Sequence, residues 1–389
     1  MKVAVTTLAF CVAALLALGL VMLYSSSMTQ VGAHYLMLQL VWCAFGIVLC
    51  VSVTALDDQW LKKFAWLIFI LALVLLVLVF VPHVGRKING ARRWLDFHGL
   101  RFQPSELAKL ALIIMLAWYG DRSQRHMQTW KRGVLLPGWL MALVLGLVFV
   151  EPDRGTTVLL AAVGGAMLLI AGVRWKHILI PTLVGVAGLA ISLLLDPMRL
   201  KRILGWWDLE QHKEGVGYQA YQAMVALGSG GWFGLGLGNG RQKLGFVPEH
   251  HTDFIFSIIG EELGLIATLL VVLAFVTIVI CGIYVALNAR DAFGFLLAVG
   301  VTFLIGLQAA INIGVVTSAL PCKGLPLPFI SYGGSNLLVM LTGVGLLFNV
   351  ARHARPRAAV AAESAETDEF SPARPAGTVA ARHRPAQAT

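Results

Sequence analysis

The chain has 389 residues, of which 58% are hydrophobic and only 13% are charged. Globular domains carry roughly twice that share of charged residues, so the composition excludes a water-soluble enzyme and indicates an integral membrane protein. The net charge of +10 lies in short loops and a tail between apolar runs, where positive charge orients helices, so we expect no nucleic-acid partner.

Apolar runs near the length needed to cross about 30 Å of hydrocarbon recur along the whole chain. They predict an all-α integral membrane protein with about ten transmembrane helices, because only helices satisfy the backbone of such runs in lipid. In chain order the expected helices span 7–24, 35–56, 64–81, 105–119, 134–150, 156–173, 178–195, 254–287, 293–318 and 335–350. The run 254–287 would be roughly 50 Å long as a straight helix, so we expect it to project from the membrane or to break near Gly260 or Gly264.

An even number of crossings places both termini on one side of the membrane, and most connections on that side are basic. The positive-inside rule makes that side cytoplasmic. The segment 82–104 then faces outward, as does a large extracytoplasmic loop, 196–252, between the seventh and eighth helices. We divide the chain into a transmembrane domain, 1–353, and a cytoplasmic tail, 354–389, whose Ala, Pro and Arg content predicts disorder.

The first outward segment concentrates cations on the side where the positive-inside rule disfavours them. They are Arg86, Lys87, Arg92, Arg93 and Arg101. Guanidinium groups clamp phosphates with paired donors, so the cluster suits a lipid that carries a diphosphate. The alternative is a set of lipid headgroup contacts without catalytic meaning. We favour substrate binding, because the placement contradicts the charge rule.

Two further motifs flank helix starts. Glu106 and Lys109 lie three residues apart on one helix face, where they form a structural ion pair or line a substrate groove, and the sequence leaves both readings open. Asp153 precedes the sixth helix, where it could bind substrate, although capping of that helix explains the position by itself.

The strongest chemical signal is the end of the large loop, Pro248–Phe254 (PEHHTDF). Asp253 lies where water meets lipid, and partial desolvation there raises the basicity of a carboxylate that takes a proton from a sugar hydroxyl. Glu249 and His251 are candidate substrate contacts. A metal site formed with His250, or a simple N-cap role for Asp253, are the alternatives.

The segment between the last two helices contains three prolines, which forbid a regular helix. Non-helical backbone at membrane depth is tolerated only against protein or a wet cavity, so we expect this segment to line the same outward cavity as Asp253. Lys323 adds a cation there, and Ser331 a hydroxyl.

Five motifs occur in a characteristic order. They are Gly90–Leu95 (GARRWL), Gln103–Glu106 (QPSE), Pro152–Thr156 (PDRGT), Pro248–Phe254 (PEHHTDF) and Ile330–Ser335 (ISYGGS). In this order they resemble the SEDS family of cell-wall polymerases, whose members include RodA, FtsW and SpoVE. The match covers nearly all of the chain up to Val350. Lys323–Pro328 (KGLPLP) and Gly260–Gly264 (GEELG) are more similar to the division-type FtsW branch than to the elongation-type RodA branch.

The resemblance implies a peptidoglycan glycosyltransferase that polymerises lipid II, a disaccharide-pentapeptide on undecaprenyl diphosphate, with inversion to a β-1,4 bond. Asp253 falls on the family's essential acid, and Glu106, Lys109 and Asp153 on positions that matter for activity. The implied setting is the outer face of the bacterial cytoplasmic (inner) membrane, at the division septum. The implied partners are a class B penicillin-binding protein (the transpeptidase), divisome membrane proteins and membrane lipids. No organic cofactor is implied, and a divalent cation, Mg²⁺ or Mn²⁺, would assist activity.

Three rival functions fit parts of the pattern. A flippase of lipid II would use the same cations but need no general base, and a scaffold that only recruits a transpeptidase would not need Asp253. An elongation-type polymerase would share the chemistry but act along the cell wall.

Overall fold

The computed structural model describes residues 1–27, 32–88, 91–97, 100–247, 251–321 and 324–354. The predicted tail, 354–389, lies outside the described residues except for Ala354. The helices are α1 (Lys2–Ser27), α2 (His34–Ala55), α3 (Asp58–Leu78), α4 (Pro104–Ser123), η1 (Gln124–His126), η2 (Lys131–Leu135), α5 (Leu136–Val150), α6 (Arg154–Ile170), α7 (Trp175–Leu194), α8 (Pro197–Trp207), α9 (Tyr218–Ser229), η3 (Gln242–Leu244), α10 (Ile255–Leu287), α11 (Ala292–Val316) and α12 (Gly334–Arg352). The strands are β1 (Gly85–Ile88), β2 (Ala91–Phe97) and β3 (Leu100–Phe102).

The ten predicted apolar runs are all helical, with ends shifted by a few residues. Among the described residues, eight helices are long and apolar enough to cross a membrane by length and composition, and α6 is a shorter apolar helix. The remaining one, α4, carries Glu106 and Lys109 in its first turns, which lowers its hydropathy although most of it is buried. The prediction of an α-helical membrane bundle is confirmed.

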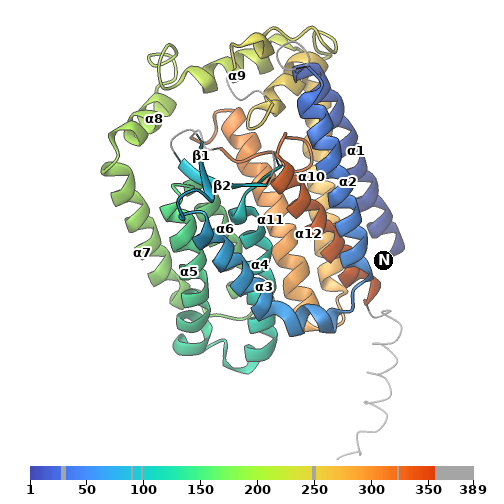
Figure 1. Cartoon of the computed structure of the whole chain (residues 1–389), viewed down its shortest axis with the longest axis vertical. Helices are drawn as coiled ribbons and strands as arrows, with labels where there is room; N and C mark the ends of the chain where they lie inside the picture. The colour runs from blue at the N-terminus through green and yellow to red at the C-terminus, as the bar shows by residue number, and fades with distance from the viewer. Residues whose placement is uncertain (28–31, 89–90, 98–99, 248–250, 322–323, 355–389) are drawn as a thin grey trace, which may run out of the picture. The chain divides into compact units, whose positions relative to one another are not determined.

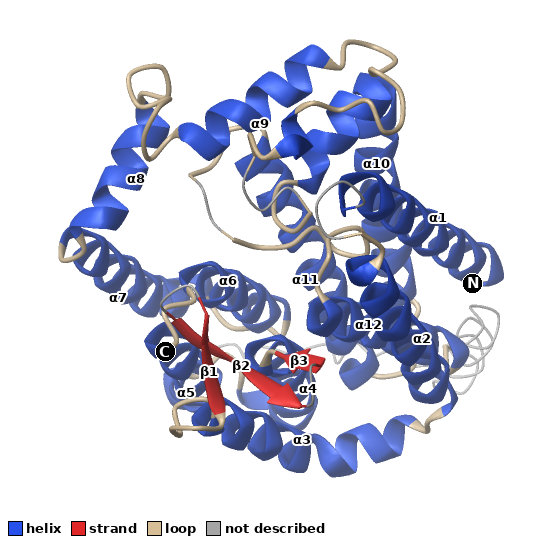
Figure 2. Cartoon of the chain, turned by 45° about the horizontal axis from the view of Figure 1, so that its top comes forward, coloured by secondary structure: helices blue, strands red, loops and turns tan. Residues whose placement is uncertain are grey.

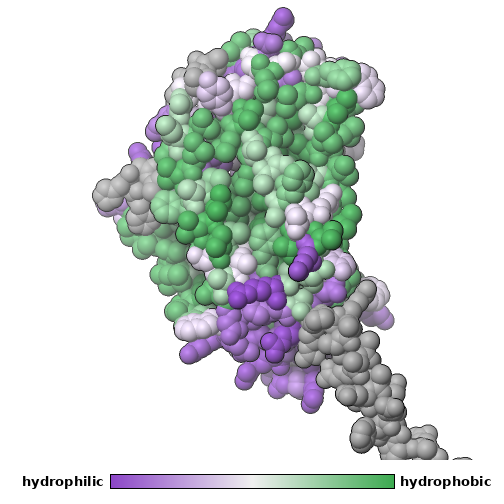
Figure 3. Space-filling model, turned by 90° about the vertical axis from the view of Figure 1, so that its right-hand side faces the viewer, coloured by the Kyte–Doolittle hydropathy of each residue, from purple (hydrophilic) through white to green (hydrophobic). Residues whose placement is uncertain are grey.

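The bundle has two distinct ends. At one end, called the loop end, lie the strands, α8 and α9 (Figure 1). The opposite end, where α12 ends, is called the tail end. There Lys62 at the start of α3 pairs with Asp121 at 3.1 Å and with Asp291 at 2.5 Å, which joins three of the connections at this end. Between the ends runs a belt of hydrophobic side chains (Figure 3).

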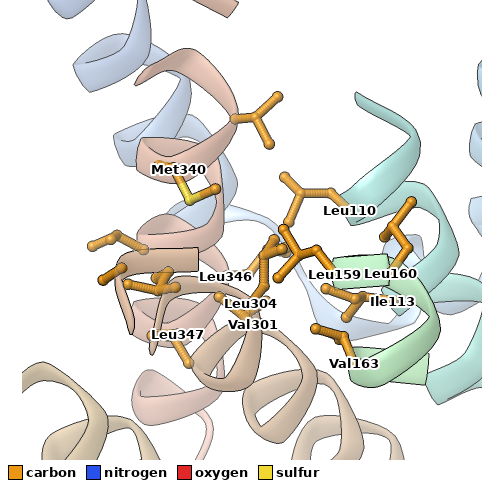
Figure 4. Close-up of a cluster of buried hydrophobic side chains, with 14 of the residues drawn as sticks. Leu110, Ile113, Leu159, Leu160, Val163, Val301, Leu304, Met340, Leu346 and Leu347 are labelled. Carbon is orange, nitrogen blue, oxygen red and sulfur yellow. The ribbon is translucent and has the colours of Figure 1, made fainter. Parts of the chain in front are cut away.

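The core lies where α4, α6, α11 and α12 meet. Leucine, isoleucine and valine side chains from α4, α6 and α11 interdigitate there with Met340 and Leu346 of α12 (Figure 4). By contrast, none of α7 is buried in the described structure, as expected of a helix that faces lipid on most sides. The helices that carry charged and amide side chains are therefore the central ones, where a neighbouring helix can satisfy those groups.

The first loop-end segment folds into a small antiparallel sheet of order β1-β2-β3, which an all-α fold does not include. Gly85 pairs with Leu95, and Leu95 pairs with Phe102. Leu95 is buried, so the sheet packs one face onto the bundle. The dipeptide Asn89–Gly90 in the sequence is a strong hairpin signal and could have predicted this sheet.

The long helix α10 breaks at Gly264, whose backbone is non-helical (φ 80°, ψ −176°). This confirms the predicted break. The glycine-rich segment 230–240 of the large loop fits into the break, so that Leu265 N–H donates to the Gly231 carbonyl at 2.9 Å and Leu235 N–H donates to the Glu261 carbonyl at 2.9 Å. Backbone groups that lose their helical partners at the break are therefore satisfied by the loop. The segment 230–240 is therefore docked against α10.

Buried charges fasten the same loop. Glu262 pairs with Lys243 at 2.6 Å and accepts a 2.6 Å hydrogen bond from Ser25 Oγ of α1. Glu261 accepts a 2.7 Å hydrogen bond from the Arg241 N–H. Both acids of the GEELG motif thus bind the loop, and together with α1 they hold the first half of α10 in place.

Candidate active site

Asp253 lies directly before α10, in a turn whose backbone is held by three neighbours. The carbonyls of the three consecutive residues 251–253 each accept a hydrogen bond. The donors are Tyr332 N–H at 3.0 Å, Ser331 Oγ at 2.6 Å and Asn312 Nδ2 at 2.8 Å. Because the backbone is fixed at every residue, the Cα–Cβ direction of Asp253 is fixed as well.

The Asp253 side chain is half-buried at the loop end of α10. A Cβ on Gly324 would lie 2.8 Å from Asp253 Oδ2, so a larger residue at this position would displace the carboxylate. The N-cap of α10 is Phe254, and no side chain caps it. The alternative that Asp253 simply caps the helix is therefore wrong.

The proline-containing segment after α11 forms the wall behind this turn. The Ser331 hydroxyl that donates to the Thr252 carbonyl also accepts a 2.8 Å hydrogen bond from Leu327 N–H. From α2, Gln39 Nε2 donates to the Ser331 carbonyl at 3.2 Å, and Gln39 Oε1 accepts from Gly333 N–H at 3.3 Å. The structure thus brings Ser331 and Asp253 together, as predicted, and gives Ser331 a role in holding the turn.

Three rings lie beside Asp253. His251 stacks on Tyr35 of α2 with ring centroids 4.9 Å apart, and Tyr332 lies 4.8 Å from Tyr35. All three rings are half-exposed. Burial, followed by the neighbouring Tyr35, raises the pKa of Tyr332, whereas the charge of Arg101 lowers it, which places Arg101 near this group. An aromatic surface of this kind suits the apolar face of a sugar ring.

Below the turn, an amide network joins α4, α11 and α12. Lys109 Nζ lies 2.8 Å from Glu106 Oε1 and 2.9 Å from Gln308 Oε1. Gln308 Nε2 donates to Asn336 Oδ1 and to the Pro326 carbonyl, both at 2.9 Å. Lys109 is fully buried. Of the two readings left open, the structural ion pair is the one that the geometry supports.

Gln308 lies one helical turn from Asn312 on α11. Asn312 Nδ2 donates to both the Leu325 carbonyl, at 2.7 Å, and the Asp253 carbonyl. The buried Glu106–Lys109 pair is therefore connected, through one face of α11, to the backbone of Asp253.

Asp153 caps α6. Its Oδ1 accepts a hydrogen bond from Thr156 N–H at 3.1 Å, and its Oδ2 accepts from Thr156 Oγ1 at 2.9 Å and from Gln103 Nε2 at 3.3 Å. Capping, the simpler explanation, is confirmed. Because the residue is only 5% exposed, its carboxylate is buried and binds the start of α6 and Gln103.

The predicted cation cluster divides into two kinds. Arg86 pairs with Asp96 across the hairpin, and Arg93 donates to the carbonyls of Glu151 at 2.9 Å and Pro152 at 2.7 Å. Arg92 and Arg101 are exposed and form no ion pair with a described residue. Arg93 thus fastens the sheet to the turn between α5 and α6, and the cations open to an anion are Arg92, Arg101 and Lys87.

Glu151 in that turn was not selected from the sequence as a site residue. It is fully buried, and neither carboxyl oxygen has a hydrogen-bond partner in the described part of the chain. Burial, followed by the charge of Asp153, raises its pKa to about 8, against the opposing effect of Arg93. Glu151 therefore carries a proton at neutral pH.

Two predicted site residues, Glu249 and Lys323, lie outside the described residues, as does His250. Among those that are described, no three His, Cys, Asp or Glu side chains lie close enough to hold a metal ion.

Sequence reasoning missed the amide residues that hold the site: Gln39, Gln308, Asn312 and Asn336. The signal was available, because a lone Gln or Asn inside an apolar helix is costly unless it has a partner. What the arrangement offers chemically is one carboxylate with a fixed direction, beside an aromatic surface and near exposed guanidinium groups. Such a group can accept a proton from a bound hydroxyl.

Comparison with known proteins gives consistent results. A family model described as "Cell cycle protein", which groups FtsW, RodA and SpoVE, matches residues 6–356. The chain is 40% identical to the probable peptidoglycan glycosyltransferase FtsW of Trichlorobacter lovleyi, over 87% of this chain and 91% of that protein. It is 37% identical to the stage V sporulation protein E of Bacillus subtilis, over 88% and 95%.

Solved structures show the same fold. A chain from a peptidoglycan synthase complex, described for its coordination of polymerization and crosslinking, is 30% identical with a TM-score of 0.76, over 89% of this chain and 96% of that one. The rod shape determining protein RodA of Thermus thermophilus is 30% identical with a TM-score of 0.68, over 90% and 97%.

Proposed function

Because the chain belongs to the cell-cycle protein family that groups FtsW, RodA and SpoVE, we propose that it is a peptidoglycan glycosyltransferase that polymerises lipid II. The substrate is a disaccharide-pentapeptide on undecaprenyl diphosphate. The observation that carries the proposal is the fixed turn 251–253, which presents the carboxylate of Asp253 at the loop end of the bundle.

Asp253 acts as the general base. It takes the proton of the acceptor sugar's 4-hydroxyl as that oxygen attacks C1 of the donor sugar. The bond between C1 and the diphosphate oxygen breaks, and the electron pair leaves with the lipid diphosphate. Attack from the face opposite the leaving group inverts the α-linked donor to a β-1,4 product.

The departing diphosphate requires positive charge. Arg101 is exposed and lies near Tyr332, and Arg92 is exposed on β2 of the same sheet. A guanidinium donates two parallel hydrogen bonds to phosphate oxygens. The rings of Tyr35, His251 and Tyr332 would pack against a sugar face and orient it. A divalent cation, if one takes part, would be held by groups beyond those described or by the substrate diphosphate, and it would supply further charge neutralisation.

The charge of the connections between helices supports an orientation of the chain in the membrane. The basic tail end is cytoplasmic, so the loop end with Asp253 faces the outside of the cytoplasmic membrane, where lipid II is displayed. The FtsW names of close relatives support a role in septal wall synthesis. The related chain in a synthase complex supports a class B penicillin-binding protein as the partner that crosslinks the strands.

The test is polymerisation of purified lipid II by the full chain, with and without its transpeptidase partner. Asp253→Asn keeps the size of the side chain but removes the base, so glycan strands should disappear while the protein remains folded. Flipping of lipid II in vesicles, measured in parallel, should be unchanged by the same variant. Strands of normal length from Asp253→Asn would overturn the proposal and favour a flippase or a scaffold. Expression of the wild-type chain in mutant cells would distinguish division from elongation. Rescue of filamentous cells, which fail to divide, indicates a role in division, whereas rescue of round cells, which fail to elongate, indicates a role in elongation.

A further inference from the structure

Arg154, the first residue of α6, is held in an unusual way. Its guanidinium lies over the Phe149 ring, 4.0 Å from the ring centroid. Its Nε and Nη1 atoms are buried and have no hydrogen-bond partner among the described residues. A buried guanidinium nitrogen without an acceptor is costly, so the site requires an acceptor that comes from elsewhere.

A second arginine shares this feature. Arg199 of α8 pairs through Nε with Asp196 Oδ2 at 2.9 Å, but its Nη1 is buried and unpartnered in the part of the chain that is described. The other oxygen of Asp196 accepts hydrogen bonds from backbone N–H groups at the start of α8, so both carboxylate oxygens of Asp196 already have donors. Arg199 and Asp196 both lie within electrostatic range of the Arg154 guanidinium. Two cations and one anion leave the group with a net positive charge.

The position of this pair is fixed by the fold. Arg154 begins α6, and Arg199 lies in the first turn of α8, which continues from the loop end of α7 beside α6 (Figure 2). Trp206 Nε1 donates to the Ser318 carbonyl at 2.8 Å and ties α8 to the end of α11. A cation at the positive end of a helix dipole is unfavourable, and at Arg154 it adds to the repulsion from Arg199. An anion bound between them would relieve both effects.

The surroundings indicate what carries that anion. Val150 lies four residues before Arg154, and Leu195 and Met198 are chain neighbours of Asp196 and Arg199. These three apolar residues are 64%, 78% and 59% exposed. Apolar side chains this exposed, at the end of a helix that faces lipid, lie in the membrane and not in water. A ligand that reaches the two guanidinium groups therefore has an apolar tail and an anionic head.

We propose that Arg154 and Arg199 bind the phosphate group of a membrane lipid at the loop end of α6 and α7. The ligand chemistry is a phosphate headgroup of net negative charge on a hydrocarbon tail, which an anionic phospholipid or a polyprenyl diphosphate supplies. The site is separate from the turn that carries Asp253, and it does not depend on the proposed glycosyltransferase activity.

The test uses the full chain in nanodiscs of neutral phosphatidylcholine that contain either phosphatidylglycerol or undecaprenyl diphosphate. Native mass spectrometry counts the phosphate lipid that the protein retains. The double variant Arg154→Gln/Arg199→Gln should lower retention of one of these lipids about tenfold, since it removes charge-assisted hydrogen bonds worth at least 1.4 kcal/mol. The lipid whose retention falls identifies the source of the phosphate.

The matched control is Lys201→Gln/Arg202→Gln, which removes the same charge from exposed positions of the same helix. The amount of phosphate lipid that this control retains should stay close to that of the wild type. Equal losses in the two double variants would show a general effect of surface charge and would overturn the proposal, as would wild-type retention no greater than that of neutral lipid. If the double variant does not fold, each single variant takes its place, and unchanged retention in both has the same consequence.

Discussion

Asn312 and Asp253 are joined by a 2.8 Å hydrogen bond from the Asn312 side-chain amide to the Asp253 backbone carbonyl. The same amide group donates to the Leu325 carbonyl at 2.7 Å. One side chain on α11 thus ties the turn before α10 to the segment after α11. The direction of the Asp253 carboxylate depends on contacts that are remote in sequence.

Replacing Asn312 with alanine removes both of these hydrogen bonds. We expect a loss of unfolding free energy of about 1–3 kcal/mol, because two buried carbonyls lose their donor. The rate of lipid II polymerisation should fall about tenfold or more, since small displacements of a catalytic group are costly. Thr317→Ala, at the exposed C-cap of α11, is the control and should leave both measurements unchanged. Wild-type turnover by Asn312→Ala would show that the carbonyl contact does not position Asp253.

The Glu106–Lys109 pair should behave as a buried unit. Lys109→Met leaves a buried carboxylate without its partner, so we expect a destabilisation of about 3–5 kcal/mol, and Glu106→Gln should act similarly. The combination of both changes should recover much of the loss, because no uncompensated charge remains. Thermal unfolding in detergent of the wild type, both single variants and the double variant gives the coupling energy. Additive losses would contradict the ion-pair interpretation.

Arg92 and Arg93 are neighbours with different expected roles. Arg93→Gln removes the donors to the Glu151 and Pro152 carbonyls, so it should lower the thermal unfolding temperature. Arg92→Gln removes an exposed cation, so it should raise the KM for lipid II while leaving the unfolding temperature within error. Comparing stability and kinetics of the two variants checks this assignment. The reverse pattern would return Arg93 to the substrate site.

Glu151 should make stability depend on pH. In the folded chain its pKa is raised to about 8, whereas the unfolded residue titrates near its ordinary value of 4.5. Between these values the folded state binds more protons than the unfolded state, so unfolding free energy decreases as pH rises, by up to about 1.4 kcal/mol per pH unit. Glu151→Gln should flatten this decrease between pH 6 and about 8, and the exposed control Glu210→Gln should not. The measurement is the unfolding temperature across that pH range.

The sequence predicted some features of this protein well, for identifiable reasons. Helix positions follow from long apolar runs, and the break at Gly264 follows from a helix too long for the membrane and a residue that tolerates positive φ. The structural role of Arg93 was not predicted, because a cation's partner cannot be read from its own segment. Its acceptors are carbonyls some 58 residues away along the chain.

The hydrogen bonds that fix the backbone at Asp253 could not be predicted, for a related reason. Its neighbours Asn312 and Ser331 use side chains to bind backbone carbonyls, and a carbonyl has no sequence signature. An amide such as Gln308 inside an apolar helix is costly to bury, so the sequence does predict that this residue has a partner. It does not predict which residue that partner is.

The glycine-rich loop that fits into the break of α10 also bears on how the protein is made. The loop, 230–240, emerges from the ribosome before α10, yet it can dock only after residues 261–266 have followed it. Until then the first half of α10 exposes unpaired backbone groups, which lipid does not tolerate. We expect this half to enter the bilayer late, after the loop has crossed.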